Sequence, residues 1–329
     1  MSSTVRNLVG VVVGLAIVIP LVLLMFISPA SKGTPHDLPI GVVGPQSAAE
    51  SVDAMLDERQ SGAFDVEAFA DVDALRTAAE NREVYGGFVL GGTPQTLIAT
   101  GASPAVATMV TQIGAGVAAQ SGAAPTVVDV APAADDDPRG AGFGSMVMPV
   151  FMAGAALGAA AALVGRRRRI IAAVLPVGAA LVAASAIGVA TWIGVLSGGF
   201  ALEWLALAAG ILAIAAPVSG LVSLTGVRGI GVAALLFMLV GMPLAGIAAP
   251  PEFLPWIWGD LGQLLPLGAT GTALRSAAFF DGAGAVAAWV VLAGWIVAGY
   301  LLLGVSRRRS HAAEHGTEQT VQTPELTPV

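Results

Sequence analysis

The stretch FGSMVMPVFMAGAALGAAAALVGRRRR, from Phe143 to Arg169, separates a polar part of the chain from an apolar part. It carries no charge between Phe143 and Val164, and about twenty apolar residues are enough for an α-helix to cross a bilayer. The arginines that close it, Arg166, Arg167, Arg168 and Arg169, predict that this end of the helix stays in the cytoplasm. We therefore expect a membrane-spanning helix whose orientation sets that of the remaining chain.

The composition of the chain is that of a polytopic membrane protein. Of 329 residues, 56% are hydrophobic and 11% are charged, and the mean hydropathy is +0.81. The absence of cysteine excludes disulfides and thiolate metal sites. The single lysine, Lys32, is followed by Gly33, so a phosphate-binding loop of the form GxxxxGK[ST] is missing. Any work driven by a nucleotide must therefore be done by another chain.

Six apolar runs predict six transmembrane helices. The first, Leu8 to Ile27, is either a signal peptide or a retained span; because an ordinary signal core has roughly 7–15 residues, we favour an N-terminal anchor over residues 1–30. With six spans, nine of the fifteen basic residues fall in short cytoplasmic segments and both termini are cytoplasmic. The other five expected spans form a domain over residues 141–305: Phe143 to Val164, Ile170 to Leu196, Phe200 to Leu224, Ile230 to Ala249 and Ala285 to Val305.

The segment between the first two expected spans, residues 31–140, holds fifteen acidic and five basic residues and cannot lie in lipid. Its pattern predicts strands at 38–44, 64–70 and 126–132, a hairpin over 85–102, and helices at 48–60, 71–84 and 103–120, the last capped by Ser103. We expect a small extracytoplasmic α/β domain, joined to the second span by a solvated tether from Ala131 to Gly140.

A second outer segment, residues 250–284, is too broken to cross the membrane. Trp256 and Trp258 lie near several prolines and suit the headgroup region, so we expect one or two interfacial or partly re-entrant helices. Asp260, Arg275 and Asp281 lie in this segment, and we expect a local pairing of Arg275 with Asp281. These groups and Glu203, near the outer end of the fourth span, form no ionisable chain across the membrane, which argues against a proton-driven carrier.

Candidate chemistry is sparse. His311, Glu314 and His315 form an HxxEH pattern of the kind found in one class of zinc peptidases, but they lie in a polar tail, residues 306–329, that we expect to be disordered and cytoplasmic. The expected spans hold neither an acid pair nor a serine–lysine pair. We expect no enzyme activity, cofactor, metal or nucleic-acid partner. Glycine pairs such as Gly154 and Gly158 predict close helix packing.

Four stretches carry a resemblance to a known family: LPIGVVGP from Leu38, ALRTAAENREVYGGFVL from Ala74, ASPAVATMVTQ from Ala102 and LPLGATGTALRSAAFFDGAG from Leu265. These stretches and the order of parts resemble the ABC-2-type transporter permeases, especially the phage-infection-protein-like branch. The resemblance implies one permease half that works as a homodimer or as a heterodimer with a second permease. It also implies a separate ABC-type ATPase subunit bound to the cytoplasmic face.

The sequence departs from many such permeases because only Met1 to Asn7 precede the first span, which leaves no room for an amphipathic cytoplasmic helix. We therefore expect the ATPase to meet Gly165 to Ile171, Thr225 to Gly229 or the tail, with Arg166 to Arg169 as the foremost candidates. The leading hypothesis is a permease of a bacterial plasma membrane that exports a hydrophobic or amphipathic substrate. The alternative is a non-transporting membrane protein whose outer domain binds a ligand, a partner or a phage.

Overall fold

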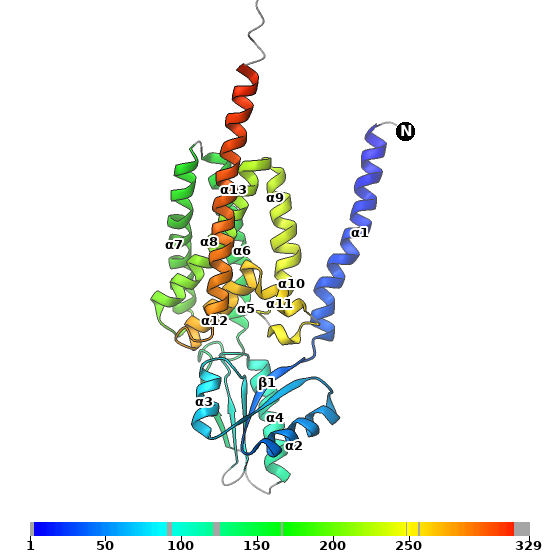
Figure 1. The fold of residues 1–329 in the computed structure, drawn as a ribbon, viewed down its shortest axis with the longest axis vertical. Coiled ribbons are helices and arrows are strands. Elements are labelled where there is room, and N and C mark those ends of the chain that lie inside the picture. Colours follow the sequence, from blue (N-terminus) through cyan, green and yellow to red (C-terminus); the bar gives the residue numbers. More distant parts are fainter. Residues whose placement is uncertain are drawn as a thin grey trace, which may run out of the picture.

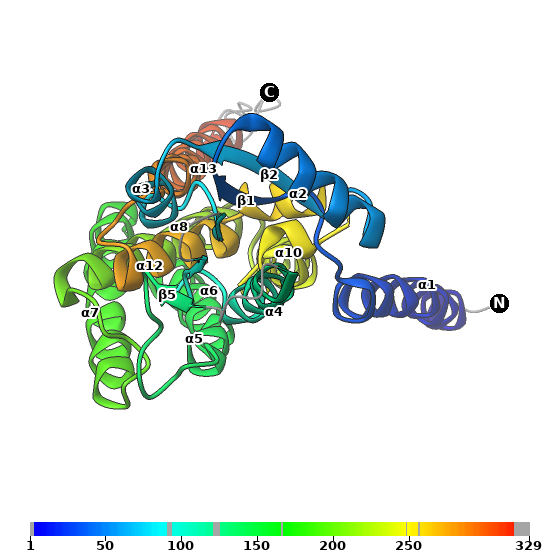
Figure 2. The same cartoon turned by 90° about the horizontal axis from the view of Figure 1, so that it is seen from below.

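The structure, a computed structural model, describes residues 3–90, 94–120, 126–165, 167–247, 249–255 and 257–318. The chain is mostly helical, with a small α/β domain at one end of a bundle of long helices (Figure 1). Seen from that end, the α/β domain lies against the bundle, and the first helix stands apart from it (Figure 2).

The α/β domain contains a five-stranded sheet in the order β2-β1-β3-β4-β5. Neighbouring strands are parallel except for the antiparallel pair β3 and β4, which confirms the predicted hairpin. The other predicted strands and helices of this domain are confirmed within a few residues. The elements are β1 (Leu38–Val43), α2 (Gln46–Arg59), β2 (Phe64–Phe69), α3 (Val72–Glu80), β3 (Gly86–Val89), β4 (Gln95–Ile98), α4 (Pro104–Gln120) and β5 (Thr126–Asp129).

The sheet is covered by helices on both faces, which explains why β1 is apolar throughout. Leu38, Ile40 and Val42 alternate along β1 and pack with α2 and α4 on one face. Val43 belongs to the cluster on the other face, where α3 lies. The predicted cap of α4 is confirmed, because the Ser103 hydroxyl accepts a hydrogen bond from the Val106 N–H at 3.3 Å.

The remaining helices are α1 (Ser3–Lys32), α5 (Ala141–Ser145), α6 (Val147–Val164), α7 (Arg168–Trp192), α8 (Phe200–Thr225), α9 (Arg228–Ala233), a π-helix η1 (Ala234–Gly241), α10 (Met242–Leu244), a 3₁₀-helix η2 (Pro251–Phe253), α11 (Trp258–Gln263), α12 (Pro266–Phe279) and α13 (Val286–Glu318). Helix α8 is the centre of the bundle and contacts α6, α7, α12 and α13. Its side chains are mostly buried, unlike those of α6, α7 and α13.

Among the described residues, four helices are long and apolar enough to cross a membrane: Ala141–Val164, Arg168–Trp192, Phe200–Thr225 and Val286–Ser306. The predicted first span lies within the helix α1, whose described apolar stretch is Thr4–Pro20. The predicted fifth span is the helical run Arg228–Leu244, interrupted by the π-helix just before Pro243, which has no N–H to donate. The structure thus supports a membrane-embedded helical protein with a small α/β sheet.

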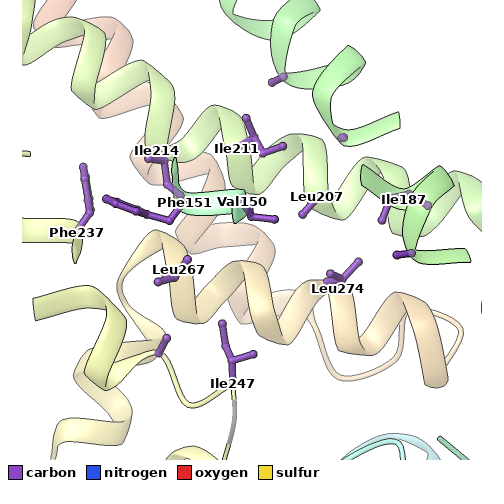
Figure 3. Close-up of a cluster of buried hydrophobic side chains, with 14 of the residues drawn as sticks. Val150, Phe151, Ile187, Leu207, Ile211, Ile214, Phe237, Ile247, Leu267 and Leu274 are labelled. Carbon is purple, nitrogen blue, oxygen red and sulfur yellow. The ribbon is translucent and has the colours of Figure 1, made fainter. Parts of the chain in front are cut away.

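Helix α12 is packed into the bundle. Its Leu267 and Leu274 face Leu207 and Ile211 of α8 in the largest apolar cluster of the described residues (Figure 3). This contact buries most of α12 inside the bundle.

Two segments predicted to lack regular structure or burial, the tether and the tail, are more ordered than predicted. In the stretch predicted as a solvated tether, Ala131 and Ala134 are buried, and the carboxylate of Asp137 accepts a hydrogen bond from the Phe143 N–H at 2.9 Å. This stretch is therefore folded between the two parts of the chain. Helix α13 continues to Glu318, so the predicted disordered tail begins as a helix, and residues 319–329 lie outside the described part.

Apart from Arg275 on α12, the described basic residues of the bundle sit at its far end from the α/β domain. Helix α7 starts with Arg168 and ends near the domain, where Gly194 contacts Asp136. The start of α1, the turn at Arg228 between α8 and α9, and the end of α13 lie at the same far end as Arg168 (Figure 1).

Candidate functional site

A cavity of about 190 Å³ lies where the α/β domain meets η2, α11 and α12. Both parts of the chain contribute to its wall. Its polar lining residues are Arg82, Tyr85, Glu252, Gln263, Thr272 and Arg275. We call this space the junction cavity.

Arg82 enters the junction cavity from the turn that ends α3. Its backbone is left-handed, with φ of 63°, and its N–H bonds the Ala79 carbonyl at 3.1 Å. This turn directs the guanidinium toward α12, where Nη1 donates to the Thr272 carbonyl at 3.1 Å. The guanidinium also lies 5.5 Å from the centre of the Phe280 ring, a cation–π distance.

Arg275 reaches the junction cavity from α12. Its Nη2 donates to the Ile247 carbonyl at 2.8 Å, and its guanidinium lies 4.8 Å from the centre of the Phe143 ring. Asp281, the predicted partner of Arg275, is exposed in a turn with φ of 49°. The expected Arg275–Asp281 pairing is wrong, because Arg275 bonds the Ile247 carbonyl and lies over the ring of Phe143 in α5 instead.

Tyr85 and Glu252 join the two parts of the chain directly. The Tyr85 hydroxyl donates to Glu252 Oε2 at 2.9 Å, and the His36 N–H donates to the Glu252 carbonyl at 2.9 Å. On the α12 side, the Thr272 hydroxyl donates to Gln263 Oε1 at 2.7 Å. The Gln263 amide nitrogen donates to the Ala245 carbonyl at 3.2 Å, which fixes the orientation of that amide.

The junction cavity is positively charged overall at neutral pH. Burial, followed by repulsion from Arg82, lowers the pKa of Arg275 to about 10, and burial also lowers the pKa of Arg82. Burial and the neighbouring Glu252 raise the pKa of Tyr85, so its hydroxyl keeps its proton. Two guanidinium cations thus face a single carboxylate, and within the described residues neither arginine forms an ion pair.

The predicted site residues lie in different parts of the structure and do not form one site. Arg275 is in the junction cavity, whereas Trp258 and the exposed Asp260 lie on α11 outside its lining. Arg167, Arg168 and Arg169 are at the far end of the bundle, at the start of α7. Trp256 and Arg166 lie outside the described residues.

Sequence reasoning missed Arg82, Tyr85, Glu252, Gln263 and Thr272 as site residues. Arg82 lies in the last turn of the predicted helix 71–84, and Tyr85 directly follows that helix. Tyr85 is one of only two tyrosines in the sequence, which is a weak signal. Glu252 lies 167 positions from Tyr85, and no local pattern indicates that these residues meet.

Comparison of the chain with protein-family models, with curated proteins and with solved structures gives no match.

Proposed function

We propose that the chain is the membrane subunit of an exporter of the ABC-2 type, similar to the phage-infection-protein-like branch, and that it moves a hydrophobic or amphipathic substrate. The observation that carries this proposal is an unbroken series of contacts from the central helix α8 to the α/β domain. The α/β domain contacts α12 through Arg82 and η2 through Tyr85, and α12 packs on the central helix α8. A displacement of α8 would therefore reach the outer domain without passing through a flexible linker.

The proposed topology has six spans, formed by α1, the run Arg228–Leu244 and the four longer helices. It places the α/β domain outside a bacterial plasma membrane and both termini in the cytoplasm. The separation of the domain from the arginine-bearing helix ends supports it, since arginine near a span favours the cytoplasmic side.

The energy would come from a separate ABC-type ATPase subunit, because this chain lacks a phosphate-binding loop. Arg167, Arg168 and Arg169, at the start of α7, lie at the end away from the α/β domain, which suits a cytoplasmic docking surface. Helix α1 exposes apolar side chains such as Leu8, Val12 and Leu24, which suits lipid or a second permease in a homodimer or heterodimer.

Co-purification from the native membrane tests the proposal. We expect a nucleotide-binding subunit to accompany the full-length chain, and reconstituted vesicles to show ATP-dependent substrate movement. Replacing Arg166 to Arg169 together with glutamine should release the subunit, whereas replacing Arg59 and Arg76 of the α/β domain should not. The absence of both an associated ATPase and ATP-dependent transport would contradict the proposal.

The junction cavity favours a second candidate, a non-transporting membrane protein whose outer domain binds a ligand. Arg82 and Arg275 give its wall a positive charge, which the export of an apolar substrate does not require. Ligand binding without any ATP-dependent flux would select this candidate.

A further inference from the structure

We propose that the junction cavity binds a phosphoryl anion, either free phosphate or the phosphate of a lipid headgroup, between Arg82 and Arg275. The proposal does not depend on export, since binding is a property of the chain alone.

The charge of the cavity favours an anion. Each guanidinium has five N–H donors, and the described side-chain hydrogen bonds of Arg82 and Arg275 use one donor each. Both bonds go to main-chain carbonyls, which carry no charge to balance the cation. A partly buried cation without a counter-charge is costly, so an anion placed between the two arginines would stabilise the junction.

Glu252 limits the charge of the anion that fits. Its carboxylate accepts the Tyr85 hydroxyl and attracts both guanidinium groups, so it cancels one of the two positive charges. On the other side of Arg275, a smaller cavity of about 30 Å³ is lined by Asp137 and Arg139, whose charges offset each other. The remaining single positive charge matches a phosphodiester or a singly charged phosphate.

Size and geometry favour a phosphoryl group over smaller anions. A cavity needs roughly 10–15 Å³ to hold one water molecule. At about 190 Å³, the junction cavity has room for a polyatomic solute. The guanidinium fork recognises oxyanions, and two forks from different parts of the chain suit a group with more than two oxygens better than a carboxylate.

Each wall of the cavity belongs to a different part of the chain. Arg82 and Tyr85 come from the α/β domain, whereas Glu252, Gln263 and Arg275 come from the helical part. A bound anion would therefore tie the outer domain to α12, and its binding should raise the thermal stability of the docked state.

Binding to the delipidated full-length protein in dodecyl maltoside tests the proposal. One arm titrates inorganic phosphate by calorimetry, with sodium acetate at equal ionic strength as the control. The other arm titrates short-chain phosphatidylglycerol, with the matching diacylglycerol, which lacks phosphate, as the control. Saturable binding of phosphate identifies a soluble source, and binding of the phospholipid alone identifies a headgroup.

Substitutions inside and outside the junction cavity test whether the anion binds there. Arg82→Gln and Arg275→Gln should each weaken binding by about tenfold or more, because a charge-assisted hydrogen bond is lost. Arg76→Gln, at an exposed position on α3, is the matched control and should leave the affinity unchanged. Glu252→Gln should tighten binding several-fold, a gain that misfolding cannot produce.

The proposal is overturned if neither arm shows binding, or if acetate binds as tightly as phosphate. It is equally overturned if Arg76→Gln weakens binding as much as Arg82→Gln does. None of these results bears on whether an ATPase associates with the chain.

Discussion

At the scale of single residues, the junction is held by hydrogen bonds whose acceptors are mostly uncharged. Arg82 crosses from the α/β domain to the Thr272 carbonyl, whereas Arg275 binds the Ile247 carbonyl within the helical part. The hydrogen bond from Tyr85 to Glu252 is the exception, because its acceptor is a carboxylate. Hydrogen bonds to charged groups are stronger than neutral ones, so this contact should be the most sensitive to mutation.

We expect Tyr85→Phe to lower the free energy of unfolding by roughly 1–2 kcal/mol, because the Glu252 carboxylate loses a donor in a partly buried place. Thermal unfolding in detergent measures this loss. Thr108→Val is the matched control, since it removes an exposed hydroxyl on α4 that bonds only the Pro104 carbonyl. An equal effect of the two substitutions would contradict the role given to Tyr85.

At the scale of elements, close backbone contact with α8 holds the bundle together. Gly154 and Gly158 of α6 face α8, as the small-residue spacing predicts, and a methyl group on Gly158 would collide with the Ala215 carbonyl. The glycine pair Gly10 and Gly14 of α1 has the same spacing but no neighbour within 4 Å. Spacing alone therefore does not identify which glycines pack.

Gly158→Ala should separate α6 from α8 and destabilise the bundle by roughly 1–3 kcal/mol. Gly188→Ala in α7 is the control, because no atom lies within 4 Å of its added methyl group. This second substitution should be neutral or slightly stabilising, since alanine favours a helix more than glycine does. Thermal unfolding of the two variants in the same detergent makes the comparison; similar melting temperatures would refute the close contact.

At the scale of the whole molecule, the protein has two chemically different ends. The acidic α/β domain occupies one end, and arginines such as Arg168 and Arg228 mark the other. Such an asymmetry is what the insertion machinery reads when it orients a membrane protein.

Because the chain has no cysteine, single cysteines can report this orientation. In intact cells, a membrane-impermeant maleimide should label Ser51→Cys on the exposed face of α2. Thr225→Cys, at the far end of α8, should react only after the membrane is opened. Labelling of Thr225→Cys alone in intact cells would reverse the proposed topology.

The sequence predicts elements whose signals are local, and it predicts contacts between distant segments poorly. The apolar run of β1 and the Ser103 cap are local signals, and both are confirmed. The burial of α12 has no such signal, because its small and apolar residues suit a lipid interface as well as the side of α8. Arg275 was recognised as a notable charge, but its partners depend on the folded linker that places Phe143 beside it.

The pairing of Tyr85 with Glu252 has a consequence for biogenesis. A chain is synthesised from its N-terminus, so the α/β domain is complete before Glu252 has left the ribosome. Arg82 and Tyr85 must then face water until η2 and α12 have been inserted. The junction is thus the last part of the α/β domain to mature. A truncated chain ending before Pro251 would carry a folded sheet whose contacts with η2 and α12 are missing.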